Sequence, residues 1–147
     1  MKLILLQGPS HCGKTETFIK LREKIMSAFG GTELHFERIN NSRDFQSVIK
    51  CNNKQIALFS MGDLKGECIK AIFKYLGVDV LVLAENAGFK ISLLEEVPLK
   101  LSYTEISGGE PPAHVIFTMD GKKTDSEKTV EENKKVAEIL AELKKSI

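Results

Sequence analysis

The feature that most constrains this chain lies near its start, where a short apolar run leads directly into a glycine-rich loop. The apolar run covers residues 3–6, and the loop that follows spans Gly8 to Thr15, with a second glycine at Gly13. Glycines let the backbone turn tightly, so that successive N–H groups can point into one concavity that suits an anion. A helix that begins at the end of the loop directs the positive end of its dipole toward the same place. The sequence therefore predicts an anion site at the first strand-to-helix turn.

The residues after the loop carry the helical pattern that this arrangement requires. Apolar side chains recur at helical spacing with charged residues between them, at Phe18, Leu21, Ile25 and Phe29. Two consecutive glycines, at positions 30 and 31, then end the predicted helix. Strand, glycine loop and helix thus follow one another in the order that a phosphate-binding loop needs.

The spacing Gly8-x-x-x-x-Gly13-Lys14-Thr15 resembles the Walker A motif, or P-loop, of the P-loop NTPase family, and the resemblance is strict over residues 1–30. It implies that the loop backbone holds the phosphates of ATP, that Lys14 reaches the β- and γ-phosphates, and that the Thr15 hydroxyl binds Mg²⁺. The expected nucleotide-binding residues are Gly8, Pro9, Ser10, His11, Cys12, Gly13, Lys14 and Thr15.

The rest of the chain predicts an α/β fold in a single domain, residues 1–147. Apolar or alternating runs predict strands over residues 33–39, 55–60 and 78–84, and helical patterns predict helices over residues 43–51 and 64–76. Near-continuous apolar strands that alternate with helices indicate a parallel sheet covered on both faces. Together with the resemblance, this predicts a three-layer sandwich of the P-loop NTPase type with a mostly parallel sheet.

The last third of the chain has a different character. Residues 99–106 and 115–119 read as strands, and the Gly- and Pro-rich stretch between them is too short for a connecting helix. We therefore expect an antiparallel hairpin at the C-terminal edge of the sheet. Thr124 and Glu127 fit a capping box at the start of a final helix. That helix is expected to bury Val130, Val136, Ala137, Leu140 and Leu143.

Composition excludes several classes of function. The net charge of +1 provides no strong field for nucleic acid or an anionic membrane, and no apolar run is long enough to span a bilayer. The three cysteines lack CxxC spacing and read as reduced thiols of a cytoplasmic protein. The histidines show no spacing typical of a zinc site.

Acidic residues near predicted strand ends are candidates to complete the site. A P-loop enzyme usually has an acidic residue at the end of an apolar strand that helps to hold Mg²⁺, but Ser60 stands at the expected position. Asp63 follows three residues later as a candidate metal-water ligand, substrate-binding group or general base, with helix capping as the alternative. Glu85 ends the next apolar strand and is a second candidate metal ligand. The predicted catalytic residues are Lys14 and Asp63, and the predicted metal ligands are Thr15, Asp63 and Glu85.

Arginines are few, and phosphoryl-transfer sites often use them to neutralise transition-state charge. Arg38 and Arg43 flank the exit of the second predicted strand and are the candidates for binding the acceptor. The alternative is that both are ordinary surface charges.

The predicted function is binding of ATP with Mg²⁺ by a small phosphotransferase that acts on a small metabolite or a nucleotide. A guanine-specific GTPase is disfavoured, because Asn53-Lys54 is not followed by the required aspartate. Two alternatives stay open: a regulatory ATPase whose slow hydrolysis switches contact with a protein partner, and a degenerate domain that binds nucleotide without turnover.

Overall fold

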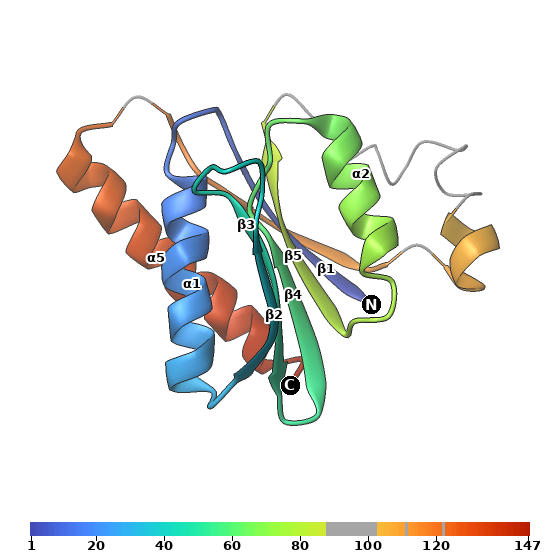
Figure 1. Ribbon diagram of the computed structural model, residues 1–147. Helices are drawn as coiled ribbons and strands as arrows, with labels where there is room; N and C mark the ends of the chain where they lie inside the picture. The colour runs from blue at the N-terminus through green and yellow to red at the C-terminus, as the bar shows by residue number, and fades with distance from the viewer. Residues whose placement is uncertain (88–102, 111, 122) are drawn as a thin grey trace.

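A computed structural model describes residues 1–87, 103–110, 112–121 and 123–147. They form an α/β fold with one six-stranded mixed sheet in the order β2-β3-β4-β5-β1-β6 (Figure 1). The strands are β1 (Lys2–Gly8), β2 (Thr32–Arg38), β3 (Phe45–Cys51), β4 (Lys54–Phe59), β5 (Val80–Asn86) and β6 (His114–Thr118). The labelled helices are α1 (Lys14–Ala28), α2 (Lys65–Lys74) and α5 (Asp125–Lys144). Over the described ranges, no helix has both the length and the apolar character needed to cross a membrane.

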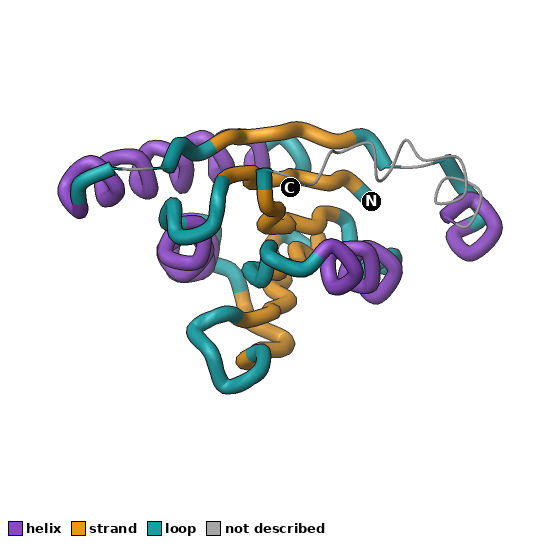
Figure 2. Tube along the Cα trace, turned by 90° about the horizontal axis from the view of Figure 1, so that it is seen from above, coloured by secondary structure: helices purple, strands orange, loops and turns teal. Residues whose placement is uncertain are grey.

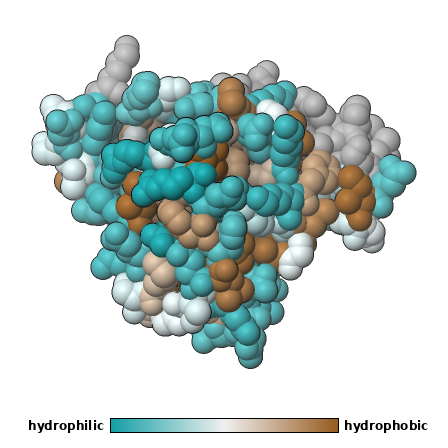
Figure 3. Space-filling view, in the orientation of Figure 1, coloured by the Kyte–Doolittle hydropathy of each residue, from teal (hydrophilic) through white to brown (hydrophobic). Residues whose placement is uncertain are grey.

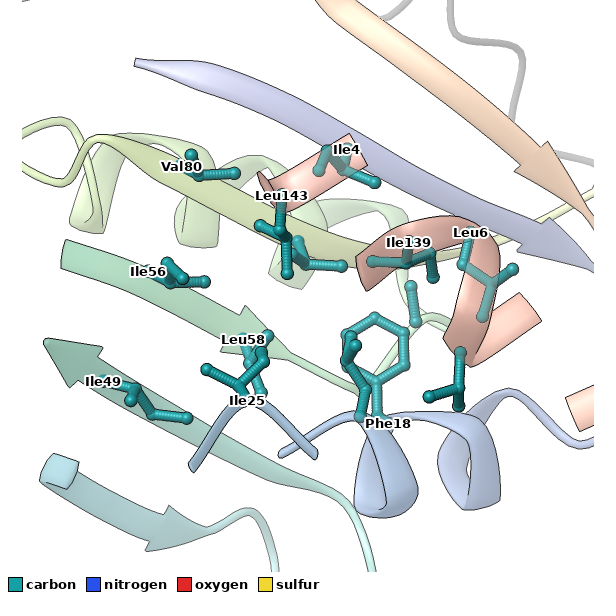
Figure 4. Close-up of a cluster of buried hydrophobic side chains, with 14 of the residues drawn as sticks. Ile4, Leu6, Phe18, Ile25, Ile49, Ile56, Leu58, Val80, Ile139 and Leu143 are labelled. Carbon is teal, nitrogen blue, oxygen red and sulfur yellow. The ribbon is translucent and has the colours of Figure 1, made fainter. Parts of the chain in front are cut away.

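Helices cover both faces of the sheet, as the strand pattern predicted (Figure 2). On one face, α1 and α5 pack on the sheet through a cluster of fully buried side chains, which includes Ile4, Phe18, Leu58 and Ile139 (Figure 4). On the other face, α2 packs on a second cluster that includes Leu5, Leu81 and Ile72. Because alternate residues of β1, β4 and β5 supply the two clusters, these central strands are apolar over most of their length.

The strand, loop and helix predicted at the start of the chain are confirmed. β1 lies inside the sheet between β5 and β6, and both of these neighbours run parallel to it. In α1, three residues of the predicted apolar stripe, Phe18, Leu21 and Ile25, are completely buried. The fourth, Phe29, is the C-cap of the helix and is only partly buried. The glycine loop (residues 8–15) therefore joins a central strand to a helix that is fixed against the sheet.

The predicted helix over residues 43–51 is wrong, because this segment contains strand β3. Its buried residues alternate along the chain, at Phe45, Ser47, Ile49 and Cys51. Phe45, Val48 and Ile49 also fit helical spacing, and a run this short does not separate the two periods. The turn that follows decides the outcome, because Asn52 and Asn53 both have positive φ, of 49° and 64°. Two such residues favour a tight hairpin that pairs β3 with β4.

The antiparallel part of the sheet lies at the opposite edge from the one predicted. β6 pairs in parallel with β1, so the predicted C-terminal antiparallel hairpin is wrong. Instead, β2 pairs antiparallel with β3, and β3 pairs antiparallel with β4. The β2–β3 turn carries Asn40 and Asn41, each with a φ of 52°, so asparagines form both hairpin turns.

Other C-terminal predictions have mixed outcomes. Residues 103–107 are helical rather than part of a strand, and residues 99–102 lie outside the described ranges. The capping box of Thr124 and Glu127 is confirmed at the start of α5. α5 buries Val136 and Leu143 as predicted, and Ile139 as well. Contrary to prediction, Val130 is 69% exposed, Ala137 is exposed and Leu140 is only partly buried. In the space-filling view, hydrophilic residues predominate near the upper end of α1 and the start of α5, with some hydrophobic residues among them (Figure 3). All three cysteines are free of disulfides and buried.

Candidate functional site

A cleft of about 430 Å³ opens where the glycine loop meets the carboxyl ends of β1 and β4. In Figure 1 the loop lies at the upper end of α1, with α5 on one side and the β2–β3 turn on the other. The lining comes from the glycine loop and the start of α1, from α5, from the residue just before β3 and from the segment after β4. The lining residues are His11, Gly13, Lys14, Thr15, Glu16, Asp44, Ser60, Gly62, Asp63, Lys128 and Glu132.

The glycine loop has the tight backbone that its sequence predicts. His11 and Gly13 have positive φ, of 62° and 107°. A Cβ on Gly8 would lie 2.5 Å from the Cys12 sulfur, so no side chain fits there. At the start of α1, Gly13 is the N-cap and no side chain caps the helix. The first N–H groups of α1 have no partner within the helix, and the residues that carry them, Gly13 to Glu16, line the cleft.

Lys14 lies inside the curve of the loop rather than in bulk water, and only 7% of it is exposed. Its ammonium donates hydrogen bonds to the carbonyl oxygens of Gly8 and Pro9, at 2.7 and 2.8 Å. The Cys12 sulfur lies 3.9 Å from the same nitrogen. A positive charge is therefore fixed beside the uncapped start of α1, where both would attract an anion.

Asp44, just before β3, connects the glycine loop to the end of β4. It was not among the residues predicted from the sequence. Its Oδ1 accepts hydrogen bonds from the hydroxyls of Thr15 and Ser60, at 2.9 and 3.0 Å. The Ser60 hydroxyl in turn accepts a hydrogen bond from the Phe45 backbone N–H at 2.9 Å. This network places one carboxylate directly beside the threonine that the motif assigns to a metal.

The sequence pattern does not identify Asp44, because the helix predicted over residues 43–51 contains it and gives no reason to place it near the glycine loop. Once β3 is known to run antiparallel to β4, the start of β3 must lie beside the end of β4. Residues just before β3 then share the same edge of the sheet as the glycine loop. The hairpin turn at Asn52 and Asn53 was the available signal for this placement.

Asp63 lines the cleft but does not cap α2. Leu64 is the N-cap of that helix, and no side chain caps it. The Ser10 hydroxyl donates to Asp63 Oδ1 at 3.4 Å, and the Asn86 side-chain amide donates to the same hydroxyl at 3.2 Å. Asp63 is an exposed carboxylate beside the glycine loop, available for chemistry in the cleft.

Glu85 does not line the cleft. It is 3% exposed and accepts a hydrogen bond from the Gln7 side chain at 3.1 Å. Its neighbour Cys68 belongs to the buried face of α2. Burial raises the pKa of the Cys68 thiol to about 12, and the negative charge of Glu85 adds to this shift. Burial also raises the pKa of the Glu85 carboxyl, and the hydrogen bond from Gln7 opposes this only in part. The structure thus places Glu85 in the core next to α2 and not among the groups that face Thr15.

We expect Glu85→Gln to stabilise the fold at pH 7.5 by about 1 kcal/mol, because the amide avoids burying a charge. A raised folded-state pKa means that Glu85 stabilises the fold below the unfolded pKa, near 4.5, and loses this contribution as pH rises through the folded value. The gain should therefore shrink at pH 4.5. Thermal melts of both proteins at the two pH values test this, and an equal gain at both would contradict it.

Neither of the arginines predicted to bind an acceptor lines the cleft. Arg38 donates to the Arg43 carbonyl oxygen at 3.2 Å and lies 5.7 Å from the centre of the Phe36 ring. Arg43 is largely exposed and forms an ion pair with Glu16. The third arginine, Arg22, donates to Glu33 at 2.7 Å. Each arginine thus has a local partner. Arg38 and Arg43 are exposed, which agrees with the alternative that both are surface charges.

Helix α5 closes the other side of the cleft with Lys128 and Glu132. Glu132 is 6% exposed and accepts a hydrogen bond from Lys20 at 2.9 Å. A Cβ on Gly13 would lie 2.7 Å from Glu132 Oε2. The start of α1 is therefore held directly against α5, a contact that no sequence motif indicated.

Comparison with known proteins adds no relative from which a role could be transferred. No protein-family model, no curated protein and no solved structure gives a significant match to this chain. Within the residues that the structure describes, no group of three or more His, Cys, Asp or Glu side chains is arranged to hold a metal ion by itself.

Proposed function

We propose that this protein binds a nucleoside triphosphate with Mg²⁺ in the cleft and transfers its terminal phosphate to a small acceptor. The observation that carries the proposal is the environment of Lys14. A buried ammonium lies 2.7 and 2.8 Å from two loop carbonyls, beside a helix start that no side chain caps. Charge-assisted hydrogen bonds to phosphate are among the strongest polar contacts in proteins, and the loop concentrates donors for them.

The residues around Thr15 fit a magnesium ion. Mg²⁺ prefers oxygen ligands and keeps several waters when it is bound through a carboxylate and substrate phosphates. The Thr15 hydroxyl and the Asp44 carboxylate, 2.9 Å apart, supply such oxygens at the edge of the loop. When bound, the ion would neutralise charge on the phosphates. The part of this chain is to hold the two oxygens in place, which Ser60 does through its hydrogen bond to Asp44.

Two further side chains support a transfer reaction. The Lys14 ammonium is positioned to stabilise charge that develops on the terminal phosphate. Asp63 lines the same cleft and can accept the proton of an attacking hydroxyl. Neither role needs a large rearrangement of the sheet or of α1.

A second candidate, a nucleotide-dependent switch with slow hydrolysis, is favoured by the arginines. All three have local partners on the surface, and none of them lines the cleft. Phosphoryl transfer without an arginine at the transition state is typically slow. In that case a partner protein would supply the missing group.

Calorimetric titration with ADP, ATP and GTP tests nucleotide binding, in Mg²⁺ and again in EDTA. We expect saturable binding that is tighter with Mg²⁺. ADP release with and without added acceptors then separates the two candidates, because a phosphotransferase accelerates strongly with its acceptor. Failure of all three nucleotides to bind under either condition would overturn the proposal.

Asp44→Asn should weaken the dependence on Mg²⁺ without removing nucleotide binding. The amide oxygen can still accept from Thr15 and Ser60, so the local structure survives while the charge is lost. We expect the Mg²⁺ concentration for half-maximal ADP release to rise about 10- to 100-fold, as for other changes near a metal. Asp125→Asn, at an exposed acid in the first turn of α5, is the matched control. Equal Mg²⁺ requirements in both variants would exclude Asp44 from the metal site.

A further inference from the structure

Glu132 of α5 is an almost completely buried carboxylate with one oxygen that stays open. The residue is 6% exposed, and its Oε1 accepts a hydrogen bond from the Lys20 ammonium at 2.9 Å. Within the described residues, that ammonium is the one hydrogen-bond donor to the side chain, so Oε2 receives none. Every fully buried side-chain nitrogen or oxygen in the same part of the chain has a partner, so Oε2 is not fully buried. Because Glu132 lines the cleft, this oxygen is accessible from it.

The open oxygen lies where the glycine loop joins α1. A Cβ on Gly13 would lie 2.7 Å from Glu132 Oε2, so the oxygen is directly against the residue that precedes Lys14. The hydrogen bond from Lys20 ties the same carboxylate to α1, and α1 and α5 share one buried core cluster. The oxygen is therefore held in place before any ligand arrives, which lowers the entropic cost of binding one.

The chemistry of a carboxylate determines what it can bind. An ionised carboxylate accepts hydrogen bonds and donates none, and its charge repels phosphate. The ligand at Glu132 Oε2 must therefore offer an uncharged or cationic N–H or O–H group. In a nucleoside triphosphate whose phosphates lie in the glycine loop and against Lys14, the ribose and the base carry such groups.

We infer that Glu132 recognises the nucleoside, because its Oε2 accepts a hydrogen bond from a ribose hydroxyl or from an N–H group of the base. This inference rests on the proposed nucleotide binding and adds a specificity-determining residue to the same cleft. The glycine loop and Lys14 bind the phosphates of any triphosphate, whereas α5 distinguishes a nucleotide from bare polyphosphate. The site would then be selective for nucleotides through a residue that belongs to no phosphate-binding motif.

Mg²⁺ complexes of ATP and of tripolyphosphate provide the test, because tripolyphosphate has three phosphates and no nucleoside. Calorimetric titration at matched ionic strength measures both affinities for the wild type and for Glu132→Gln, which has the same shape without the charge. We expect the wild type to bind ATP at least about tenfold more tightly than tripolyphosphate. In Glu132→Gln the affinity for ATP should fall about tenfold, as a charged acceptor is lost. The affinity for tripolyphosphate should not fall, because a negative charge has left the cleft.

Glu142→Gln is the matched control. Glu142 lies on the same helix, is also largely buried and is paired with Lys2 away from the cleft. This variant should keep both wild-type affinities. Three analogues, 2′-deoxy-ATP, 3′-deoxy-ATP and purine riboside triphosphate, each lack one hydrogen-bond donor of ATP. The analogue without the donor that Glu132 binds should bind the wild type more weakly than ATP and should bind Glu132→Gln no worse.

An equal loss of affinity for ATP and tripolyphosphate in Glu132→Gln would mean that the carboxylate acts on the structure of the loop, and it would overturn the inference. The inference also fails if the wild type binds the two ligands equally, or if Glu132→Gln binds ATP as the wild type does. In each of these cases, binding of tripolyphosphate would still support the phosphate-binding role of the loop. Binding of neither ligand would refute the proposed function itself.

Discussion

Lys14→Ala is expected to lower the affinity for Mg-ATP by at least about 100-fold, because two charge-assisted contacts to phosphate disappear. The wild-type ammonium is already positioned inside the loop, 2.7 Å from the Gly8 carbonyl oxygen. Binding phosphate therefore requires it to exchange partners, not to move in from solvent. Calorimetric titration of both proteins measures the loss, and circular dichroism checks that the variant keeps its fold.

Lys24→Ala is the matched control, because Lys24 lies on the same helix, two to three turns further along, and is exposed. It removes the same charge from α1 without touching the loop. We expect its affinity for Mg-ATP to equal that of the wild type within about twofold, since a distant exposed charge is screened by salt. If Lys14→Ala binds Mg-ATP as well as Lys24→Ala does, the phosphate-binding role of the loop is refuted.

Gly13→Ala is expected to destabilise the fold by about 3 kcal/mol and to damage the site as well. At a φ of 107°, a side chain is strained by on the order of 1–3 kcal/mol. The new Cβ would also lie 2.7 Å from Glu132 Oε2, which forces α5 or the loop to shift. Denaturant unfolding at neutral pH measures the free energy of unfolding.

Gly30→Ala separates the two causes. Gly30 also has a positive φ, of 63°, but a Cβ there would have no atom within 4 Å. We expect this control to lose only about 1 kcal/mol, from backbone strain alone. Adding Glu132→Ala to Gly13→Ala should recover part of the loss, because the clash disappears while the strain persists. An equal loss for Gly13→Ala and Gly30→Ala would show that the contact with α5 is unimportant.

Much of the fold could be predicted, since strongly patterned elements dominate it. β1 and β5 contain uninterrupted apolar runs and α1 has a clear helical stripe, and tertiary packing reinforces both patterns. The error at β3 arose because the apolar residues of this short segment also fit helical spacing. The hairpin turns that decide between strand and helix depend on asparagines with positive φ. The parallel pairing of β6 with β1 is a long-range contact that no local pattern encodes.

The candidate site likewise contains residues that could be predicted from the sequence and residues that could not. The residues of the glycine loop could be proposed as site residues because they are consecutive in the sequence. Each residue type in the motif also has a physical reason for its position. Asp44 and Glu132 could not be identified, because they reach the loop from the turn before β3 and from α5, which lie far from it in the sequence. Glu85 was a candidate because it ends an apolar strand, but the alternation of side chains along β5 directs it into the core beside Cys68. Nucleotide binding itself stays a prediction.

Strand β2 forms an outer edge of the sheet, and its composition has a consequence for the behaviour of the protein in concentrated solution. An uncovered edge strand offers unpaired backbone groups to which a neighbouring molecule could add a strand. Four of the seven residues of β2 are ionisable, at Glu33, His35, Glu37 and Arg38, and its pairing register shifts between Glu33 and His35. Ionisable side chains and an irregular register both oppose lateral association, so this edge is protected against growth into fibrils.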